Sequence, residues 1–316
     1  MFQRISAKVA YLSTWLGLAV GCRVAKRFPG TLFWLAERLA SIAFVCFKGF
    51  RNRSVNNVRV ALGDGLSQTV IDRIVRRSIE NFFRACVETA IAVRNTDAEF
   101  RSYIPLVGRE HLDAALAKGN GVLVLSAHLG NFFLLGSRLA IENYPTFVLV
   151  NQPRNGRFAE MMDYYRLRVR QRTIHARPRR EALREVNRIL RWNQVAVMIA
   201  DEFRKEGGIE VPFFKGTVIA RRGPVTLALR TGAALVPACV YRQADGTLKL
   251  IIEPELELDR SSKGNQQVRE NTLRMTRWLE RTIRDYPDQW NWMNIRWWQS
   301  KNQNMVQSEK RLQSEA

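Results

Sequence analysis

Cysteine and histidine are both scarce in this sequence, which has four cysteines and three histidines among 316 residues. The cysteines are far apart in apolar surroundings, and neither residue type has the spacing of metal ligands. We therefore expect neither a disulfide framework nor a metal site. The cysteines are expected to be small core or membrane-facing residues, which indicates a reducing, cytoplasmic environment for the folded part.

Acidic residues are also in short supply, since 29 Asp and Glu oppose 50 Lys and Arg and leave a net charge of +21. Such a surplus predicts an anionic partner. Charge alone does not distinguish among nucleic acid, phospholipid headgroups and an acidic carrier protein. Arginine dominates the basic residues and favours phosphate and carboxylate recognition. Nucleic-acid binding would rest on charge alone, and the apolar segments near the N-terminus argue against it.

The sequence has no uncharged run long enough to cross a bilayer as one straight helix. Residues 9–22 form a run of 14 uncharged residues, whereas roughly 20 are needed to span the bilayer core. A second apolar stretch, residues 31–50, is interrupted by Glu37 and Arg38. Arg, Lys and Trp flank both segments, which predicts a hairpin lying in the membrane interface or one tilted span.

We favour retention of this segment over a cleaved signal peptide, because no small-residue cleavage site is followed by a polar mature start. Its basic flanks are expected on the cytoplasmic leaflet, where anionic lipid attracts them. The sequence is thereby divided into a membrane-associated helical segment (1–53), a main domain (54–298) and a polar tail (299–316).

The main domain is expected to open with a long amphipathic helix, because apolar residues recur every three or four positions over residues 70–91 behind the N-cap Ser67. Short apolar runs then alternate with helical patterns. Strands are expected at 121–126, 146–150, 195–200, 235–241 and 248–253, and helices at 131–142, 157–171, 181–192 and 224–231. This alternation predicts an α/β fold with a mainly parallel, mixed sheet flanked by helices.

His128 is the first candidate for chemistry, because it directly follows the buried strand expected at 121–126 and precedes a helix. An open α/β sheet presents its catalytic groups at such positions, at the carboxyl ends of the strands. A single histidine there can equally be a satisfied structural residue. Position alone therefore leaves both interpretations open.

Separated blocks of sequence strengthen the functional interpretation. They are RNRSVNNVRVAL (51–62), SAHLGNFFLLG (126–136), EVPFFKGTVIARRGPVTLALRTGAALVP (210–237) and DQWNWMNIRWW (288–298). Together they resemble the late lipid A acyltransferases of the lauroyl and myristoyl type, which belong to the wider lysophospholipid acyltransferase superfamily. The resemblance covers roughly residues 5–298 and implies a fold like that of the glycerolipid acyltransferases.

The resemblance implies a chemistry that suits these residues. In the family a histidine acts as general base on an acceptor hydroxyl, which attacks an acyl thioester directly, and a carboxylate after four intervening residues orients the imidazole. Imidazole suits the task because its pKa of about 6.5 lets it take and release a proton near neutrality. Backbone amides around Gly130 and Asn131 would stabilise the thioester oxyanion, and Gly130 would permit close approach.

The resemblance also implies substrates and a location. The donor would be an acyl carrier protein or coenzyme A thioester, and no cofactor is implied beyond it. The acceptor would be a glycolipid, with a lipid A precursor as the first expectation. The enzyme would act on anionic membrane at the cytoplasmic face of the bacterial inner membrane.

Phe133 departs from the family pattern, since it stands where Asp or Glu is expected. One explanation is that another carboxylate supplies the role, with Asp201, Glu202 and Glu210 as candidates. Asp201 and Glu202 end a predicted strand and so lie at the carboxyl edge of the sheet. Alternatively His128 works unassisted at a reduced rate, or the chain has lost catalysis and kept lipid binding as an accessory protein.

Arginines mark the expected anion sites. Arg221 and Arg222 resemble the family block that borders the acceptor phosphate, and they precede a helix whose first turn holds a proline. A solvated basic loop is the alternative. Arg154, in the loop after the strand 146–150, is a second phosphate-binding candidate.

Two further groups of residues are open to more than one interpretation. Arginines at 166, 168, 170 and 172 are expected to line a helix and either meet an acidic carrier protein or the headgroup layer, or form a solvated face. The tryptophans at 290, 292, 297 and 298, with Arg296, form either an interfacial aromatic anchor or part of the core.

Overall fold

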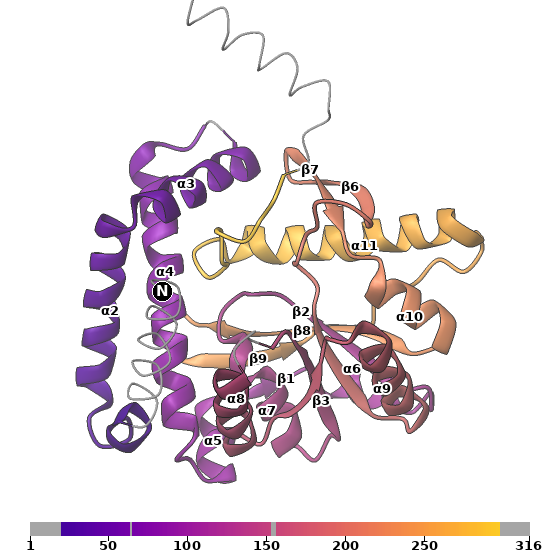
Figure 1. Ribbon diagram of the computed structural model, residues 1–316, viewed down its shortest axis with the longest axis horizontal. Helices are drawn as coiled ribbons and strands as arrows, with labels where there is room; N and C mark the ends of the chain where they lie inside the picture. Colours follow the sequence, from indigo (N-terminus) through magenta and orange to yellow (C-terminus); the bar gives the residue numbers. More distant parts are fainter. Residues whose placement is uncertain (1–19, 64, 153–155, 298–316) are drawn as a thin grey trace, which may run out of the picture.

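A seven-stranded sheet forms the centre of the computed structural model, which describes residues 20–63, 65–152 and 156–297 (Figure 1). The strand order is β1-β9-β8-β2-β5-β3-β4. The strands are β1 Leu106–Val107, β2 Val122–Ser126, β3 Thr146–Val150, β4 Arg172–His175, β5 Val195–Ile199, β8 Ala234–Arg242 and β9 Leu248–Ile252. All neighbouring pairs are parallel except β8 and β9, so the predicted mainly parallel, mixed sheet is confirmed.

Strand β2 lies at the middle of the sheet and is buried along its whole length. Leu123 and Leu125 point into one apolar core, and Val122 and Val124 point into another on the opposite face. This two-residue alternation explains why an uninterrupted apolar run forms a strand here, since both faces of the sheet are covered.

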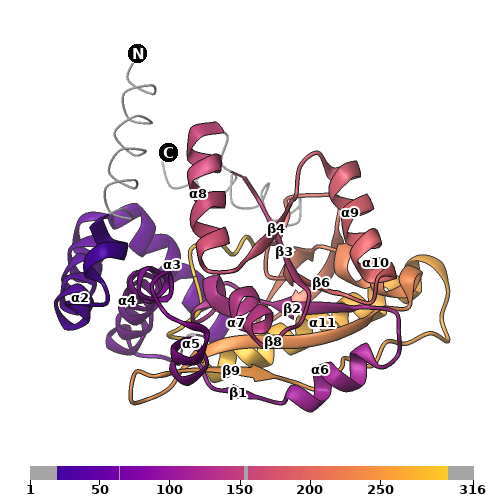
Figure 2. The same cartoon turned by 90° about the horizontal axis from the view of Figure 1, so that it is seen from below.

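Helices cover the two faces (Figures 1 and 2). One core includes side chains from α5 Asp97–Tyr103, α6 Arg109–Leu116 and α7 Leu135–Ile141. The other includes side chains from α4 Gln68–Ala92, α9 Arg179–Arg191, α10 Gly223–Thr231 and α11 Gly264–Asp285. The N-cap predicted for α4 is confirmed, because the Ser67 side chain accepts a hydrogen bond from the amide of Val70.

Two regions differ from the sequence prediction. The helix expected at 157–171 is α8 Gly156–Arg168, which ends before Arg170, a residue with a left-handed φ of 59°. Strand β4 follows it and pairs with β3. Of the four arginines expected on one helix, Arg166 and Arg168 therefore lie in α8, Arg170 in the turn and Arg172 in β4. A separate antiparallel hairpin, β6 Ile209–Phe213 and β7 Gly216–Ala220, was also not predicted.

The N-terminal helices lie beside the main sheet, at one end of the molecule (Figures 1 and 2). Helix α2 Pro29–Cys46 packs along α4, and α3 Lys48–Leu62 follows it and runs through the domain boundary expected after residue 53. Within the described residues no single helix is both long and apolar enough to cross a membrane. The α2–α3 pair, bent by 89°, meets the length and composition requirement together.

Other parts of the N-terminal and C-terminal predictions fall outside the described residues. Most of the apolar run 9–22 and the whole of the expected tail 299–316 lie there. Within α2, Leu35, Leu39 and Ile42 share one exposed helix face, whereas Ala36 and Ala40 are buried. The helix therefore presents an apolar surface to solvent.

Candidate active site

The carboxyl ends of β2 and β5 bring two polar residues together. His128 stands two residues after β2, and Asp201 stands two residues after β5. The two strands are parallel neighbours with Ser126 opposite Ile199, and the amide of Ala200 continues the ladder to the Ser126 carbonyl at 2.8 Å. Matching register thus places His128 and Asp201 side by side at the sheet edge predicted for the site.

Asp201 holds His128 through both of its carboxylate oxygens. Its Oδ1 lies 2.9 Å from Nδ1 of the imidazole, and its Oδ2 accepts the His128 backbone N–H at 2.8 Å and the Trp290 indole N–H at 2.7 Å. The Asp201 side chain is only 2% exposed, whereas that of His128 is 20% exposed. Nε2 of His128 has no hydrogen-bond partner in the described part of the chain, so it is left for a ligand.

The two partners shift each other's pKa. Burial alone would lower the pKa of His128, but the charge and hydrogen bond of Asp201, together with the charge of Glu202, raise it above its ordinary value. Burial alone would raise the pKa of Asp201, but its interactions with His128 and the Trp290 indole hold it below its ordinary value. Asp201 is therefore ionised at neutral pH and stabilises a protonated imidazole.

The other two carboxylates considered from the sequence have different surroundings. Glu202 lines the cavity beside His128, where it accepts a hydrogen bond from the Asn151 amide at 3.0 Å and pairs with Arg221 at 2.6 Å. Glu210 is exposed on β6 and does not line that cavity. Of the three, Asp201 is the one that forms a hydrogen bond with the imidazole.

Phe133 lines the same cavity as His128, and its ring contacts other aromatic rings. Its ring packs 4.1 Å from Phe132 and 6.0 Å from Phe82 of α4, measured between centroids. Phe132 is the residue beside His128, edge to face at 4.9 Å. Because Asp201 already holds Nδ1, the site has an orienting carboxylate without one at position 133.

The backbone amides of Gly130 and Asn131, predicted as oxyanion donors, both form backbone hydrogen bonds in this structure. The Gly130 amide donates to the Gln289 carbonyl at 3.0 Å, and the Asn131 amide donates to the Val240 carbonyl at 2.9 Å. Both donors are thus already used. Gly130 has a φ of 56°, and a Cβ there would lie 2.0 Å from the Val240 oxygen, so a close backbone contact explains the glycine.

Asn131 is also buried away from the cavity. Its side-chain amide donates to Glu88 at 2.8 Å, and Glu88 in turn pairs with Arg242. The sequence prediction that Asn131 contacts substrate is therefore not supported, because its side chain belongs to a buried polar network between α4 and β8.

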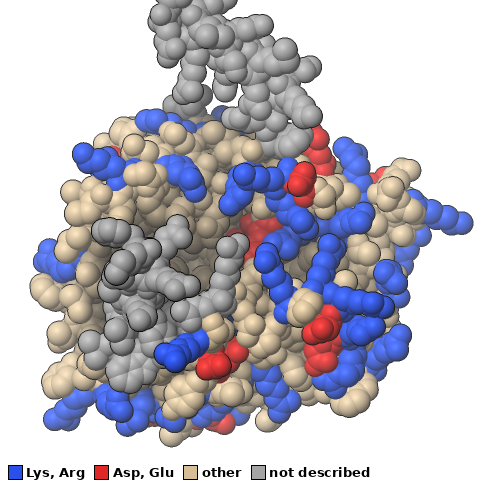
Figure 3. All heavy atoms as spheres, viewed as in Figure 1, with Lys and Arg blue, Asp and Glu red and all other residues tan. Residues whose placement is uncertain are grey.

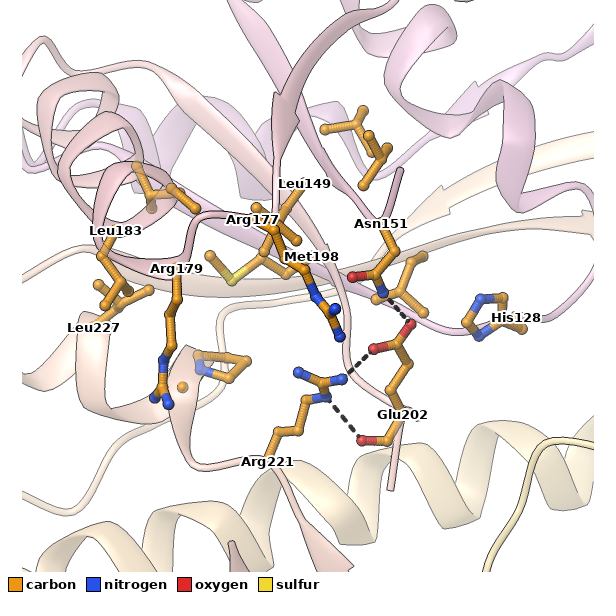
Figure 4. Close-up of a pocket in the computed structure, with 18 of the residues that line it drawn as sticks. His128, Leu149, Asn151, Arg177, Arg179, Leu183, Met198, Glu202, Arg221 and Leu227 are labelled. Atoms are coloured by element: carbon orange, nitrogen blue, oxygen red, sulfur yellow. Dashed lines mark hydrogen bonds and ion pairs between the residues drawn. The ribbon is translucent and has the colours of Figure 1, made fainter. Parts of the chain in front are cut away.

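A cavity of about 540 Å³ opens beside His128 (Figure 4). Its apolar lining includes Val148, Leu149, Val150, Ala182, Leu183, Val186, Met198, Ile199 and Leu227. Its charged lining includes Arg166, Arg177, Arg179, Arg204, Arg221, Arg222 and Glu202. Figure 4 shows His128 at one edge of the cavity and the apolar residues Leu183 and Leu227 at the opposite edge.

The cavity arginines include the predicted pair and others that the sequence did not reveal. Arg221 and Arg222 both line it, Arg221 in contact with Glu202. Arg154 lies outside the described residues. Arg177 and Arg179 were not predicted, because strand β4, which precedes them and brings them to the same sheet edge as His128, was not predicted. Neither forms an ion pair with another described residue.

The arginines make this side of the molecule strongly basic. Figure 3 shows Lys and Arg gathered on the half of the face where α9 and α10 lie, with few Asp and Glu among them. An anionic group approaching the cavity would meet a favourable field before it reached any single side chain.

The C-terminal tryptophans pack in the core. Trp290 and Trp292 are each 1% exposed, and Trp297 packs against Gly216 while its indole donates to Asn57 at 2.9 Å. Trp298 lies outside the described residues. The interfacial-anchor interpretation is therefore wrong for Trp290 and Trp292, whereas Trp297 is partly buried against the same core, and Trp290 is part of the site.

Comparison with known proteins matches residues 1–299 to the model of one family, the bacterial lipid A biosynthesis acyltransferases. The chain belongs to this family. The resemblance drawn from the four sequence blocks is thereby confirmed, and the chain is an acyltransferase that transfers groups other than aminoacyl groups.

The chain is similar to proteins that are named for more than one kind of lipid. A phosphatidylinositol mannoside acyltransferase of Mycolicibacterium smegmatis is 26% identical over 289 residues, which cover 89% of this chain and 90% of the relative. A lipid A biosynthesis palmitoleoyltransferase of Escherichia coli is 23% identical over 299 residues, 93% of this chain and 94% of the relative. A phosphatidylinositol mannoside acyltransferase of Mycobacterium tuberculosis is 33% identical over 144 residues, 44% of each chain.

Proposed function

We propose that this acyltransferase moves a fatty acyl group from an acyl carrier protein or coenzyme A thioester to a hydroxyl of a glycolipid. The observation that carries the proposal is the His128–Asp201 pair at the mouth of a cavity with apolar and arginine-rich parts. A lipid A precursor is the first candidate acceptor. The reaction requires no cofactor beyond the donor.

His128 acts as the general base in this proposal. Its Nε2 takes the proton from the acceptor hydroxyl as the oxygen attacks the thioester carbonyl carbon. The carbon–sulfur bond then breaks, and the leaving thiolate takes the proton back from the imidazolium. Asp201 fixes the tautomer with the proton on Nδ1 and stabilises the imidazolium while it exists.

The two kinds of cavity lining suit the two ends of a lipid substrate. Apolar side chains from β3, β5, α9 and α10 suit an acyl chain, because burying it removes hydrocarbon from water. The guanidinium groups of Arg177, Arg179 and Arg222 suit phosphate oxygens of the donor or the acceptor headgroup. Arg221 is already engaged by Glu202, so it would bind an anion only by exchanging partners.

We place the protein on the cytoplasmic face of the bacterial inner membrane. The exposed apolar face of α2 supports contact with a bilayer, and basic residues near its ends, including Arg27, Lys48 and Arg51, suit anionic headgroups. Segment 1–53 would form the membrane-associated part and 54–298 the catalytic part.

Acyl transfer by the purified full chain tests the proposal. Acyl carrier protein and coenzyme A thioesters of several chain lengths would be offered with a lipid A precursor and, in a separate arm, with a phosphatidylinositol mannoside. We expect an acylated glycolipid as the product in one arm. The rate of acyl transfer by His128→Ala should be lower than that of the wild type by a factor of at least about 10³. Lipid binding without turnover for every donor would instead support the non-catalytic accessory protein.

A further inference from the structure

Trp290 contacts the Asp201 carboxylate without lining the cavity. Its indole Nε1 donates to Oδ2 of Asp201 at 2.7 Å, and the residue is 1% exposed. The bond is therefore shielded from water on both sides, since the Asp201 side chain is itself almost fully buried. A buried carboxylate that lost such a donor would have an unsatisfied lone pair in a low-dielectric interior.

The backbone around Trp290 also holds the His128 loop. Leu129 and Trp290 form an antiparallel bridge, and the Asn291 amide donates to the His128 carbonyl at 3.0 Å. The Gly130 amide donates to the carbonyl of Gln289 at 3.0 Å. One segment, residues 289–291, therefore touches both members of the pair, its backbone contacting the histidine loop and its indole contacting the carboxylate.

Helix α4 fixes that segment in turn. The Ser78 hydroxyl donates to the Trp290 carbonyl, and the Asn81 side-chain amide donates to the Asp288 carbonyl at 2.9 Å. The position of the indole is thus determined by the main fold, and the indole can set the position of Asp201.

An indole is chemically suited to this place. It offers one neutral N–H donor on a large apolar ring system, so the same side chain can donate a hydrogen bond to Oδ2 and pack in the apolar core. An arginine or lysine there would satisfy the same oxygen but would also neutralise the carboxylate, and Asp201 would then stabilise an imidazolium less.

We propose that Trp290 is a positioning residue, whose indole N–H locks Asp201 in the orientation that holds Nδ1 of His128. The inference rests on the proposed role of His128 as base. It extends the catalytic arrangement to a third residue, which acts through Asp201 and does not touch the substrate.

The test compares Trp290→Phe with a matched control, Trp292→Phe. Trp292 is equally buried, packs 4.8 Å from Trp290, and donates its indole N–H to the Pro287 carbonyl at 2.6 Å, away from Asp201. Trp290→Phe is expected to lower kcat by about tenfold to a hundredfold with little change in KM. Trp292→Phe is expected to lose comparable thermal stability and to keep kcat within about threefold.

A double-mutant cycle with Asp201→Asn isolates the route of the effect. If Trp290 acts through Asp201, Trp290→Phe changes kcat little in the Asp201→Asn background. Equal losses of kcat in both tryptophan variants, or the same fold loss from Trp290→Phe in both backgrounds, would overturn the inference. Should Trp290→Phe fail to fold, benzothienylalanine at position 290 keeps the indole shape without the donor and decides the question. An inactive wild type would instead count against the proposed function.

Discussion

At the scale of single residues, the site depends on a carboxylate that is remote in sequence and adjacent in space. Asp201 is 73 positions from His128 and 2.9 Å from its Nδ1. A histidine that works as a base needs one nitrogen fixed and the other free, and this arrangement supplies both. Phe133 is then free to serve another purpose, as part of an aromatic cluster with Phe82 and Phe132.

Asp201→Asn should leave the fold intact and impair the base. By analogy with the loss of the orienting aspartate in a catalytic triad, kcat should fall by about 10³- to 10⁴-fold, because the tautomer is no longer fixed and the imidazolium is no longer stabilised. Steady-state kinetics with the preferred donor measures the loss. A decrease of less than about threefold would mean that His128 works without this partner.

The same variant should change the pH profile. His128 accepts a proton only when it is neutral, so kcat/KM of the wild type should rise as pH passes upward through its raised pKa. Asparagine removes the largest charge that raises this pKa. The acid limb of the profile should therefore move to lower pH, because only the charge of Glu202 is left to oppose the lowering of the His128 pKa by burial.

An acid introduced at position 133, where the resemblance leads us to expect one, should not improve the enzyme. Phe133→Glu would place a carboxylate among aromatic rings, and Nδ1 of His128 is already taken by Asp201. We expect a rate no higher than that of the wild type and a free energy of unfolding lower by about 1–3 kcal/mol. Rescue of Asp201→Asn by Phe133→Glu would show instead that position 133 can reach the imidazole.

At the scale of elements, the sheet could be predicted from the sequence better than the site. Continuous apolar runs identified β2, β3, β5, β8 and β9, and the strand-end rule identified the edge where His128 lies. Asp201 was among the candidates because it follows the carboxyl end of β5. The sequence could not show that Asp201, and not Glu202, contacts His128. That depends on which of the two side chains points inward, and tertiary packing determines the direction.

Other features had no reliable local signal. Strand β4 is short and follows a basic helical pattern, so Arg172 was assigned to the helix. The bond from Trp290 to Asp201 joins segments 89 residues apart, and no periodicity encodes such a contact. The hydrogen bond from the Gly130 amide to the Gln289 carbonyl could not be predicted either, because a sequence does not show which backbone amides already have an acceptor.

Helix α4 is tied to β8 by a buried ion pair, and removing one partner should destabilise the fold. The side chains of Glu88 and Arg242 are 1% and 9% exposed. Glu88→Ala leaves the guanidinium buried and unpaired, which should cost about 3–5 kcal/mol of unfolding free energy. Chemical unfolding measures it, with Glu185→Ala as a control, because that exposed pair with Arg188 should contribute at most about 1 kcal/mol.

At the scale of the whole molecule, α2 lies at one end of the long axis and α9 and α10 lie at the other (Figures 1 and 2). The exposed apolar residues of α2 and the arginine-rich cavity are therefore separate surfaces. A protein that works on membrane lipids can use the first to bind the bilayer and the second to bind the reacting groups.

Charged substitutions on α2 should weaken membrane binding without unfolding the protein. Leu39 and Ile42 are 42% and 56% exposed, so the double variant Leu39→Glu and Ile42→Glu disturbs little packing. Binding of the full chain to anionic phospholipid vesicles should weaken by about tenfold or more. Trp192→Glu, which alters an exposed apolar residue at the far end, is the control, and equal weakening there would contradict a specific role for α2.

The contact of residues 289–291 with the His128 loop has a consequence for biosynthesis. A growing chain completes β2 and β5 long before the residues that hold His128 and Asp201 in place have been made. Nascent chains on the ribosome would therefore have these strands before the contacts that hold His128 and Asp201 in place can form. Acyl transfer is expected to begin only after residues 289–291 have been synthesised and have packed against the His128 loop, so that shorter nascent chains do not acylate lipids.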